Sequence, residues 1–246
     1  MTTKLRILTY NTHKSKNWSG QNESVESLKQ FIIESEADIV FLQEVIGANK
    51  DRKIETPHFE DLADEIWDDF AYGKNATYQN GHHGNAILSR YPIVTWQQQS
   101  ISNNRFEQRG LLYAKITVPI NSEMIPIHLY CVHLDLLESG RKKQIAKVIE
   151  RIKVEVGDDP YILAGDFNDW NLAINKILKD ELNLQECFYT AHGSYAKTFP
   201  VFLPALKLDR IYISGFKINS AQVLSNKLSH HYSDHLPLMT EIIFEK

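Results

Sequence analysis

The sequence predicts an α/β fold in which helices cover layered β-sheets. Stretches with the pattern of strands outnumber those with the pattern of helices, and the helical stretches recur between groups of strands. This order is typical of a layered α/β architecture. No Gly-, Ser- or Pro-rich linker and no internal repeat interrupts the 246 residues, so we expect a single domain over residues 1–246.

Runs of apolar or alternating residues predict the strands. Residues 4–10 alternate, whereas residues 38–43 form the continuous apolar run of a buried strand. Turn-forming residues at Gly84, 90–92 and 119–121 separate several of the others. Those other strands are predicted over residues 85–89, 93–96, 111–118, 125–133, 161–164, 210–213, 216–224 and 238–244.

Apolar residues at helical spacing predict four helices. The first follows the polar pair Gln21-Asn22, which we interpret as its start signal, and the third, which is the most strongly amphipathic, has Ser139 as its expected N-cap. The polar and charged residues 47–57 are predicted to form a loop. The helices are expected over residues 25–32, 59–67, 145–152 and 174–178.

The charge balance argues mildly against tight, non-specific binding of nucleic acid. The net charge is −4 and the isoelectric point is about 6.2, whereas such binders are usually basic. Nuclease activity stays open, because a local basic rim or a bound Mg²⁺ can attract a phosphate. A chain of this length needs no metal to stabilise its fold, so we expect any metal here to be catalytic.

Cysteine usage and hydropathy point to the cytoplasm as the default location. Cys131 and Cys187 are far apart and in no CxxC pattern, so two buried free thiols are expected. Residues 1–8 lack the long apolar segment of a secretory signal. No run approaches the roughly 20 apolar residues of a membrane span.

Polar residues of catalytic type repeatedly stand where a predicted strand begins or ends. Strand ends of a layered sheet can converge on one rim, where rigid elements aim side chains at a ligand. Carboxylate and amide oxygens favour Mg²⁺, Ca²⁺ or Mn²⁺ over Zn²⁺. The pattern thus indicates one site for a hard cation and a phosphate. Its residues are Asn11, Gln43, Glu44, His133, Asp166, Asn168, Asp209, Asp234 and His235.

Seven short blocks, taken together and in order, resemble the endonuclease/exonuclease/phosphatase superfamily. They begin near residues 9–11 and 42–45, continue through 84–89, 132–134, 165–168 and 208–211, and end with Ser-Asp-His-Leu-Pro at 233–237. The chain looks closest to a bacterial branch marked by residues 81–85, 165–170 and 198–200. The resemblance implies a DNase I-like αββα sandwich of four layers, in which two packed, mostly antiparallel sheets carry helices outside.

The resemblance also implies metal-binding and catalytic roles. Glu44 would be the principal ligand of Mg²⁺ (or Mn²⁺), Asn11 would orient Glu44, the metal or a phosphate oxygen, and Asp234 would be a second metal ligand. Gln43 would support this group or be a buried structural amide. Among the catalytic residues, Asp166 would position or deprotonate the attacking water, and Asn168 would hold that water. Asp209 would pair with His235, which would face the phosphate. His133 would lie across the phosphate from them.

Three further residues are candidates for binding the substrate. Arg109 would bind phosphate or brace the site, or be a solvated arginine at a strand start. His83 and Asn85 belong to the Gly-His-His-Gly-Asn block and would contact the substrate, or form a polar loop before a strand. His230-His231 is expected in a solvated loop.

Two positions depart from many nucleases of the family. His13 stands where those nucleases carry an acidic residue, and His133 stands where some have Tyr. We therefore expect the metal preference of this protein to differ from that of those nucleases. His133 also makes cleavage at abasic sites a less favoured activity. Trp170 and Phe199-Pro200 would form an apolar wall or part of the core, and residues 202–206 form an unusually apolar loop.

Three functions compete. The first is a nuclease or other phosphodiesterase acting on nucleic acid. The second is a phosphodiesterase or phosphatase for a lipid or small molecule, which the isoelectric point and the apolar residues 202–206 favour. The third, a non-catalytic binding module, is disfavoured because every main block is intact. The family resemblance implies a monomer.

Overall fold

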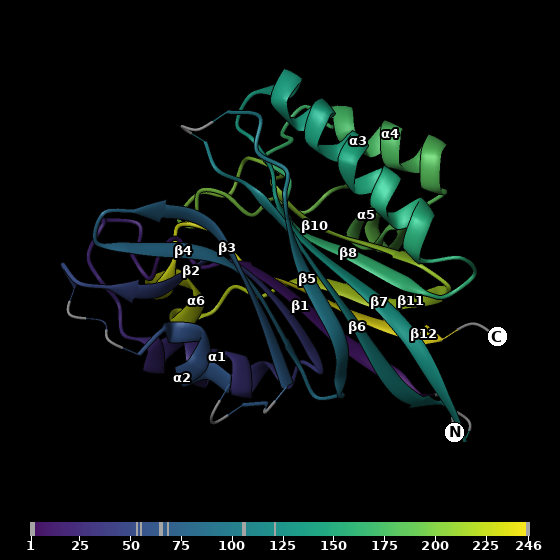
Figure 1. Ribbon diagram of the computed structural model, residues 1–246, viewed down its shortest axis with the longest axis horizontal. Coiled ribbons are helices and arrows are strands. Elements are labelled where there is room, and N and C mark those ends of the chain that lie inside the picture. The colour runs from purple at the N-terminus through teal and green to yellow at the C-terminus, as the bar shows by residue number, and fades with distance from the viewer. Residues whose placement is uncertain are drawn as a thin grey trace.

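The computed structural model describes residues 3–52, 54, 56–63, 66–67, 69–104, 107–120 and 122–244. Two six-stranded sheets pack face to face, with helices on their outer faces (Figure 1). The predicted four-layer sandwich is confirmed. Within the described strands, the pairing is antiparallel except between β1 and β2 and between β7 and β8.

The first sheet joins the two ends of the chain. Its strand order is β11-β12-β1-β2-β4-β3. Three helices pack on its outer side: α1 (Val25–Ser35), α2 (His58–Ala63) and α6 (Lys227–Tyr232). The strand bounds are β1 Lys4–Asn11, β2 Ile39–Asn49, β3 Asp69–Tyr78, β4 Gly81–Ser89, β11 Phe216–Val223 and β12 Leu238–Phe244.

The second sheet is built from the middle of the chain. Its order is β5-β6-β7-β8-β10-β9. Helices α3 (Glu138–Glu155) and α4 (Ala173–Leu182) cover its outer face, and the short α5 (Cys187–His192) packs against β10 and β11. The strand bounds are β5 Ile93–Ser100, β6 Gly110–Ile120, β7 Glu123–His133, β8 Tyr161–Asp166, β9 Gln185–Glu186 and β10 Asp209–Ser214.

Alternation along the strands explains the layers. In β1, Leu5 and Ile7 enter the core between the sheets, whereas Leu8 and Tyr10 pack towards the helices. Successive side chains of a strand point to opposite faces. Because both faces of the central strands are covered, strands such as β2 and β8 carry apolar residues on both faces.

Some predicted boundaries are wrong. Strand β2 continues through Asn49 into the segment expected as a loop, and α3 begins at Glu138 with Leu137, not Ser139, at its N-cap. The pair His230-His231 lies in α6, a helix too short to show periodicity, which begins with a capping box at Asn226. Of the residues assigned to predicted elements, 53, 55, 64, 65 and 121 lie outside those described.

The predicted strands do not include β3, because polar residues interrupt the apolar ones along Asp69–Tyr78. It is an edge strand with half-buried or exposed side chains over much of its length. Such a strand needs no continuous apolar run.

Strand pairing gathers the predicted site residues at one rim. In the first sheet, Asn11 pairs in register with Gln43. In the second, Asp166 pairs with His133 on one side and Asp209 on the other. Among the described helices, none is long and apolar enough to cross a membrane.

Candidate active site

A cavity of about 880 Å³ opens where the rims of the two sheets meet. Asp209 lies directly behind it, in contact with His235. Asn85 does not line it. The predicted residues that do line it are Asn11, Glu44, His83, Arg109, His133, Asp166, Asn168, Asp234 and His235.

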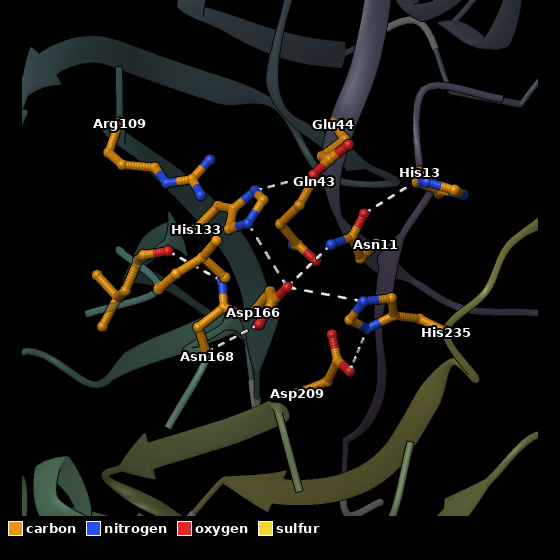
Figure 2. A network of polar contacts seen from close by, with 12 residues as sticks. Asn11, His13, Gln43, Glu44, Arg109, His133, Asp166, Asn168, Asp209 and His235 are labelled. Atoms are coloured by element: carbon orange, nitrogen blue, oxygen red, sulfur yellow. Dashed lines mark hydrogen bonds and ion pairs between the residues drawn. The ribbon is translucent and has the colours of Figure 1, made fainter. Parts of the chain in front are cut away.

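Asp166 is the centre of the polar network (Figure 2). Asn11 Nδ2 donates to its Oδ2 at 2.9 Å, and the backbone N–H of Asn168 donates to its Oδ1 at 2.9 Å. The carboxyl is buried, and burial together with the nearby Asp209 raises the pKa of Asp166 to about 6. At neutral pH it is therefore an ionised carboxylate whose pKa is suited to accepting a proton.

The backbone around Asp166 has a conformation that requires particular residues. Gly165 has φ +142°, and a Cβ there would lie 2.0 Å from the Val132 carbonyl oxygen. Only glycine permits that approach between β7 and β8. Asn168 adopts a left-handed φ of 49°, and its Nδ2 donates to Leu134 O at 3.0 Å. This bond fixes the orientation of the Asn168 carboxamide.

His235 is held as an imidazolium by Asp209. Its Nδ1 lies 2.8 Å from Asp209 Oδ2, which also accepts a hydrogen bond from Thr198 Oγ1 at 2.6 Å. Burial opposes the charge, but the Asp209 carboxylate prevails and raises the pKa of His235 to about 10. The ring therefore brings a positive charge to the cavity beside Asp166, whose Oδ2 is 3.9 Å from His235 Nε2.

His133 is neutral by contrast. Burial and the positive charge of Arg109 hold the pKa of His133 well below its ordinary value. Its ring nitrogens lie 3.6 Å from Asp166 Oδ2 and 3.8 Å from Glu44 Oε1, both longer than a hydrogen bond. The two histidines thus differ in charge although each faces carboxylates.

Glu44 is an ionised, half-buried carboxylate in an unusual backbone conformation. Its φ is 57°, and its Oε2 accepts a hydrogen bond from Lys14 Nζ at 2.5 Å. Burial opposes ionisation, but a charged His133 and the Lys14 ammonium lower the pKa of Glu44 to about 2. Since His133 is neutral at physiological pH, Lys14 is the cation that faces Glu44 there.

Two groups of side chains can be considered for a divalent metal ion. Ligand atoms of Asp166, Asp209 and His235 lie within 4.8 Å of one another. Asp209 Oδ1 is buried and lacks a hydrogen-bond partner within the described part of the chain. A metal bound to His235, however, would have to replace a proton held with a pKa of about 10. The ionised Glu44 presents no such obstacle and is the type of ligand that Mg²⁺ prefers.

The other two expected metal ligands differ in how they are engaged. The amide of Asn11 bonds at both ends, since its Oδ1 also accepts from the backbone N–H of His13 at 3.0 Å. This arrangement makes Asn11 a direct support of Asp166. Asp234 is half-buried in the cavity wall, with its Oδ1 3.4 Å from Nδ1 of His13.

The three expected substrate-binding residues are not equivalent. Arg109 lines the cavity and pairs with Glu107 at 2.8 Å. His83 also lines it, and burial, followed by the charge of Lys14, lowers the pKa of His83 to about 4. Asn85 is fully buried and instead ties the two sheets together. Its Nδ2 donates to the carbonyls of Gly110 and Cys131 at 3.1 and 3.3 Å, and its Oδ1 accepts from Asn75.

Gln43 is fully buried beside the site. Its Nε2 donates to Thr9 Oγ1 at 3.3 Å and to Cys131 Sγ at 3.4 Å. Its Oε1 has no hydrogen-bond partner among the described residues. The amide therefore packs between the two sheets behind Glu44.

Sequence reasoning missed Lys14 and the role of Thr198. Lys14 lies in the loop after β1, and its signal was a lone cation three residues beyond Asn11. Thr198 stands in the block that marks the bacterial branch, but its bond to Asp209 depends on a contact that the sequence does not reveal.

A buried charge cluster supports the cavity rim at Trp170. Asp169 is fully buried, 3.2 Å from Arg210 Nη1 and 3.7 Å from Arg141 Nε. The Arg141 guanidinium lies over the Trp170 ring, 4.7 Å from its centroid. Trp170 is 48% exposed and lines the cavity, so it forms part of a wall and not of the core.

An apolar surface continues outward from the cavity. Phe199 and Leu206 line the cavity itself. Beyond them, the rings of Trp18 and Phe202 lie 5.8 Å apart and are 60% and 65% exposed. Leu203 is also exposed. We call Trp18, Phe202 and Leu203 the apolar rim.

Comparisons with known proteins agree with this architecture. The sequence model described as the Endonuclease/Exonuclease/phosphatase family matches residues 8–235. The uncharacterized protein YbhP of Escherichia coli K12 is 42% identical over 243 residues, which cover 96% of this chain and 95% of that protein. An endonuclease/exonuclease/phosphatase from Beutenbergia cavernae superposes with a TM-score of 0.81 at 18% identity, over 98% of this chain and 72% of that one. A mannosyl-6-phosphatase of Bacteroides thetaiotaomicron superposes with a TM-score of 0.74 at 18% identity, over 98% and 100% of the two chains.

Proposed function

Because the chain belongs to the endonuclease/exonuclease/phosphatase family, whose members hydrolyse phosphoesters, we propose that it is a Mg²⁺-dependent phosphodiesterase that acts as a nuclease. One observation carries the proposal. Asp166, a carboxylate with a pKa of about 6, lies beside His235, whose pKa Asp209 raises to about 10. A base for water and a cation for phosphate thus share one cavity.

Asp166 accepts the proton of the attacking water in this mechanism. Asn11 and the backbone N–H of Asn168 hold its two oxygens, so the carboxylate is preorganised. Asn168, fixed by its bond to Leu134 O, positions the water or a phosphate oxygen. Water attacks phosphorus in line with the bond that breaks.

The imidazolium of His235 stabilises the negative charge that develops on the phosphoryl oxygens. Asp209 keeps that ring charged and fixes its tautomer. His133 is neutral before substrate binds, so it serves as a hydrogen-bond donor and not as the acid that protonates the leaving group. Arg109 and His83 supply further contacts to the phosphate.

Glu44 is the residue that would hold Mg²⁺ (or Mn²⁺), with Asp234 as a further ligand. A bound Mg²⁺ supplies Lewis-acid stabilisation of the leaving oxygen. The ionised state of Glu44 and its position in the same cavity as Asp166 support this assignment.

A second candidate function is favoured by the apolar rim. Trp18 and Phe202 lie outside the cavity and continue its apolar lining at Phe199 and Leu206. Such a surface suits the apolar part of a lipid or small-molecule phosphodiester. It also suits a nucleobase, which stacks on aromatic rings.

A substrate panel tests the function and separates the two candidates. The purified protein is assayed with supercoiled DNA, RNA, sphingomyelin, inositol phosphates and a chromogenic phosphodiester, each with Mg²⁺, Mn²⁺ or EDTA. We expect hydrolysis of DNA or RNA with Mg²⁺ or Mn²⁺ and none with EDTA. Turnover confined to the lipid or to the small molecules would establish the second candidate. Cleavage that persists in EDTA would refute the metal requirement, and inactivity in every condition would leave a binding module.

A further inference from the structure

We propose that Lys14 is a counter-ion of Glu44, which competes with a divalent metal ion for this carboxylate and thereby lowers the affinity of the site for the metal. The inference rests on the proposed function in one respect, namely that Glu44 is the metal ligand. Lys14 would oppose metal binding at Glu44, and a bound phosphate would relieve this opposition by pairing with the ammonium.

The geometry of the ion pair is the first support. Lys14 Nζ lies 2.5 Å from Glu44 Oε2, and the Glu44 side chain is only 13% exposed. A charge-assisted hydrogen bond of this length is among the stronger polar contacts in proteins. The ammonium therefore neutralises the carboxylate and covers one of its two oxygens, so it competes with a divalent cation for Glu44.

The loop that carries Lys14 is the second support. His13, Lys14 and Ser15 have left-handed φ values of 45°, 54° and 51°. Residues with side chains rarely adopt this conformation, and a run of three persists only where the surroundings hold it. The conformation aims Lys14 back at β2, on which Glu44 lies.

Several buried contacts hold this loop. Arg52 Nη1 donates to Lys14 O at 2.6 Å, and its Nη2 donates to Ser15 O at 3.3 Å. The Ser15 hydroxyl lies 2.8 Å from Tyr232 Oη and 3.0 Å from His58 Nδ1. These hydrogen bonds fix the conformation of the turn and therefore the position of Lys14 beside Glu44.

The neighbouring basic groups do not replace Lys14 as the partner of Glu44. Nδ1 of His133 lies 3.8 Å from Glu44 Oε1, which is longer than a hydrogen bond. Arg109 pairs with Glu107 at 2.8 Å. Within the described part of the site, Lys14 is therefore the cation in hydrogen-bond contact with Glu44.

Two consequences follow for metal binding. A divalent ion that binds Glu44 must displace the ammonium, so Lys14 weakens the affinity for the metal. The lysine side chain is flexible, so the displaced ammonium can stay in the cavity and form an ion pair with a phosphate there. Binding of metal and of phosphate should therefore reinforce each other, and this coupling is reciprocal.

Titration with Mn²⁺ tests the inference without reference to turnover. Free Mn²⁺ is followed by electron paramagnetic resonance for the wild type and for Lys14→Met, with and without inorganic phosphate. We expect Lys14→Met to bind Mn²⁺ about tenfold more tightly without phosphate, which corresponds to about 1.4 kcal/mol. We also expect phosphate to tighten Mn²⁺ binding by the wild type more than by the variant.

Two further lysine variants separate the contact from general charge. Lys16→Met removes the same charge from the same loop, and we expect its Mn²⁺ affinity to stay within about twofold of the wild type, because Lys16 does not line the cavity. Lys14→Arg keeps the charge and should keep the weak affinity. Lys14→Gln repeats the test if Lys14→Met does not fold.

The outcomes distinguish this inference from the proposed function. Equal or weaker Mn²⁺ binding by both Lys14→Met and Lys14→Gln would overturn the counter-ion role. Equal tightening by Lys16→Met would also overturn it. Glu44→Gln tests the metal site itself: if it binds Mn²⁺ as well as the wild type, the assignment of Glu44 under the proposed function fails, whatever the lysine variants do.

Discussion

Asp209 and His235 form a buried ion pair in which His235 Nδ1 lies 2.8 Å from Asp209 Oδ2. The carboxylate side chain is fully buried, and the imidazole side chain is 8% exposed. Because this partner keeps the ring protonated, the cavity contains a fixed positive charge over the physiological pH range. The pair links the stability of the fold to the chemistry of the site.

The stability of the protein should fall on the alkaline side because of this pair. The pKa of His235 rises from an ordinary 6.5 to about 10 in the folded protein. The stabilisation is therefore fully present below about pH 6.5 and is lost as the pH rises through 10. Urea unfolding at a series of pH values, followed by circular dichroism, should show a steeper alkaline loss for the wild type than for Asp209→Asn. Parallel curves for the two proteins would contradict the pairing.

The rate of hydrolysis should be bell-shaped in pH. Activity rises as Asp166, with a pKa of about 6, loses its proton, and it falls as His235 loses its proton near pH 10. A bound cation lowers the acidic limit further, because it favours the carboxylate. The measurement is kcat/KM from about pH 4 to 11 with a chromogenic phosphodiester. An acidic limit that stays in place in Asp166→Asn would exclude Asp166 as its source.

Loss of either central group should nearly abolish turnover while the protein stays folded. Removal of one preorganised charge-stabilising group typically costs roughly 10²- to 10³-fold in rate. We expect Asp166→Asn and His235→Ala each to lose at least that much in kcat. Asp180→Asn, at an exposed position of α4, is the matched control and should keep full activity. Near-normal turnover by either central variant would remove it from the mechanism.

The apolar rim should affect substrate binding and not the chemical step. Trp18→Ala and Phe202→Ala each remove one ring of an exposed aromatic pair. For a substrate with an apolar or base moiety we expect KM to rise about 5- to 150-fold, since base–aromatic stacking is worth about 1–3 kcal/mol, with kcat little changed. Trp96→Ala, which removes an exposed tryptophan from β5, is the control. An equal effect on a small substrate that lacks such a moiety would show that the rim acts only through the fold.

Asp169 should be a major contributor to stability. Its carboxylate faces the guanidinium groups of Arg141 and Arg210 and also accepts the N–H groups of Ala173 and Ile174 at the start of α4. Breaking a buried charge pair on one side commonly costs about 3–5 kcal/mol. We expect Asp169→Asn to lower the free energy of unfolding in urea by that order. Asp180→Asn should change it by less than about 0.5 kcal/mol, and an equally small effect of Asp169→Asn would mean that the cluster contributes little.

Much of the site was predictable because it is formed by strand ends. His133 and Asp166 lie side by side owing to strand register, as do Asn11 and Gln43, and the apolar runs before these residues indicate the strands. The layered fold was predictable for the same reason. The contacts of residues in irregular loops could not be predicted from the strand pattern.

Lys14 and Asn85 show where sequence reasoning ends. The contact of Lys14 with Glu44 depends on three consecutive left-handed residues, a conformation that His-Lys-Ser does not indicate. Asn85 resembles a substrate contact by its block, but its amide bonds with the backbone of the opposite sheet. Residue type alone does not tell which side of a strand faces a cavity and which faces a neighbouring layer.

The site lies between the two sheets, so its geometry depends on how the sheets are positioned relative to each other. Glu44 and Asn11 belong to one sheet, whereas Asp166 and His133 belong to the other, and side-chain packing and hydrogen bonds between the sheets set their distances. A sliding of one sheet over the other by about one ångström would leave every strand intact, yet misplacement on that scale can cost about 10²-fold in rate. On heating, we therefore expect the loss of activity to precede the loss of secondary structure measured by circular dichroism.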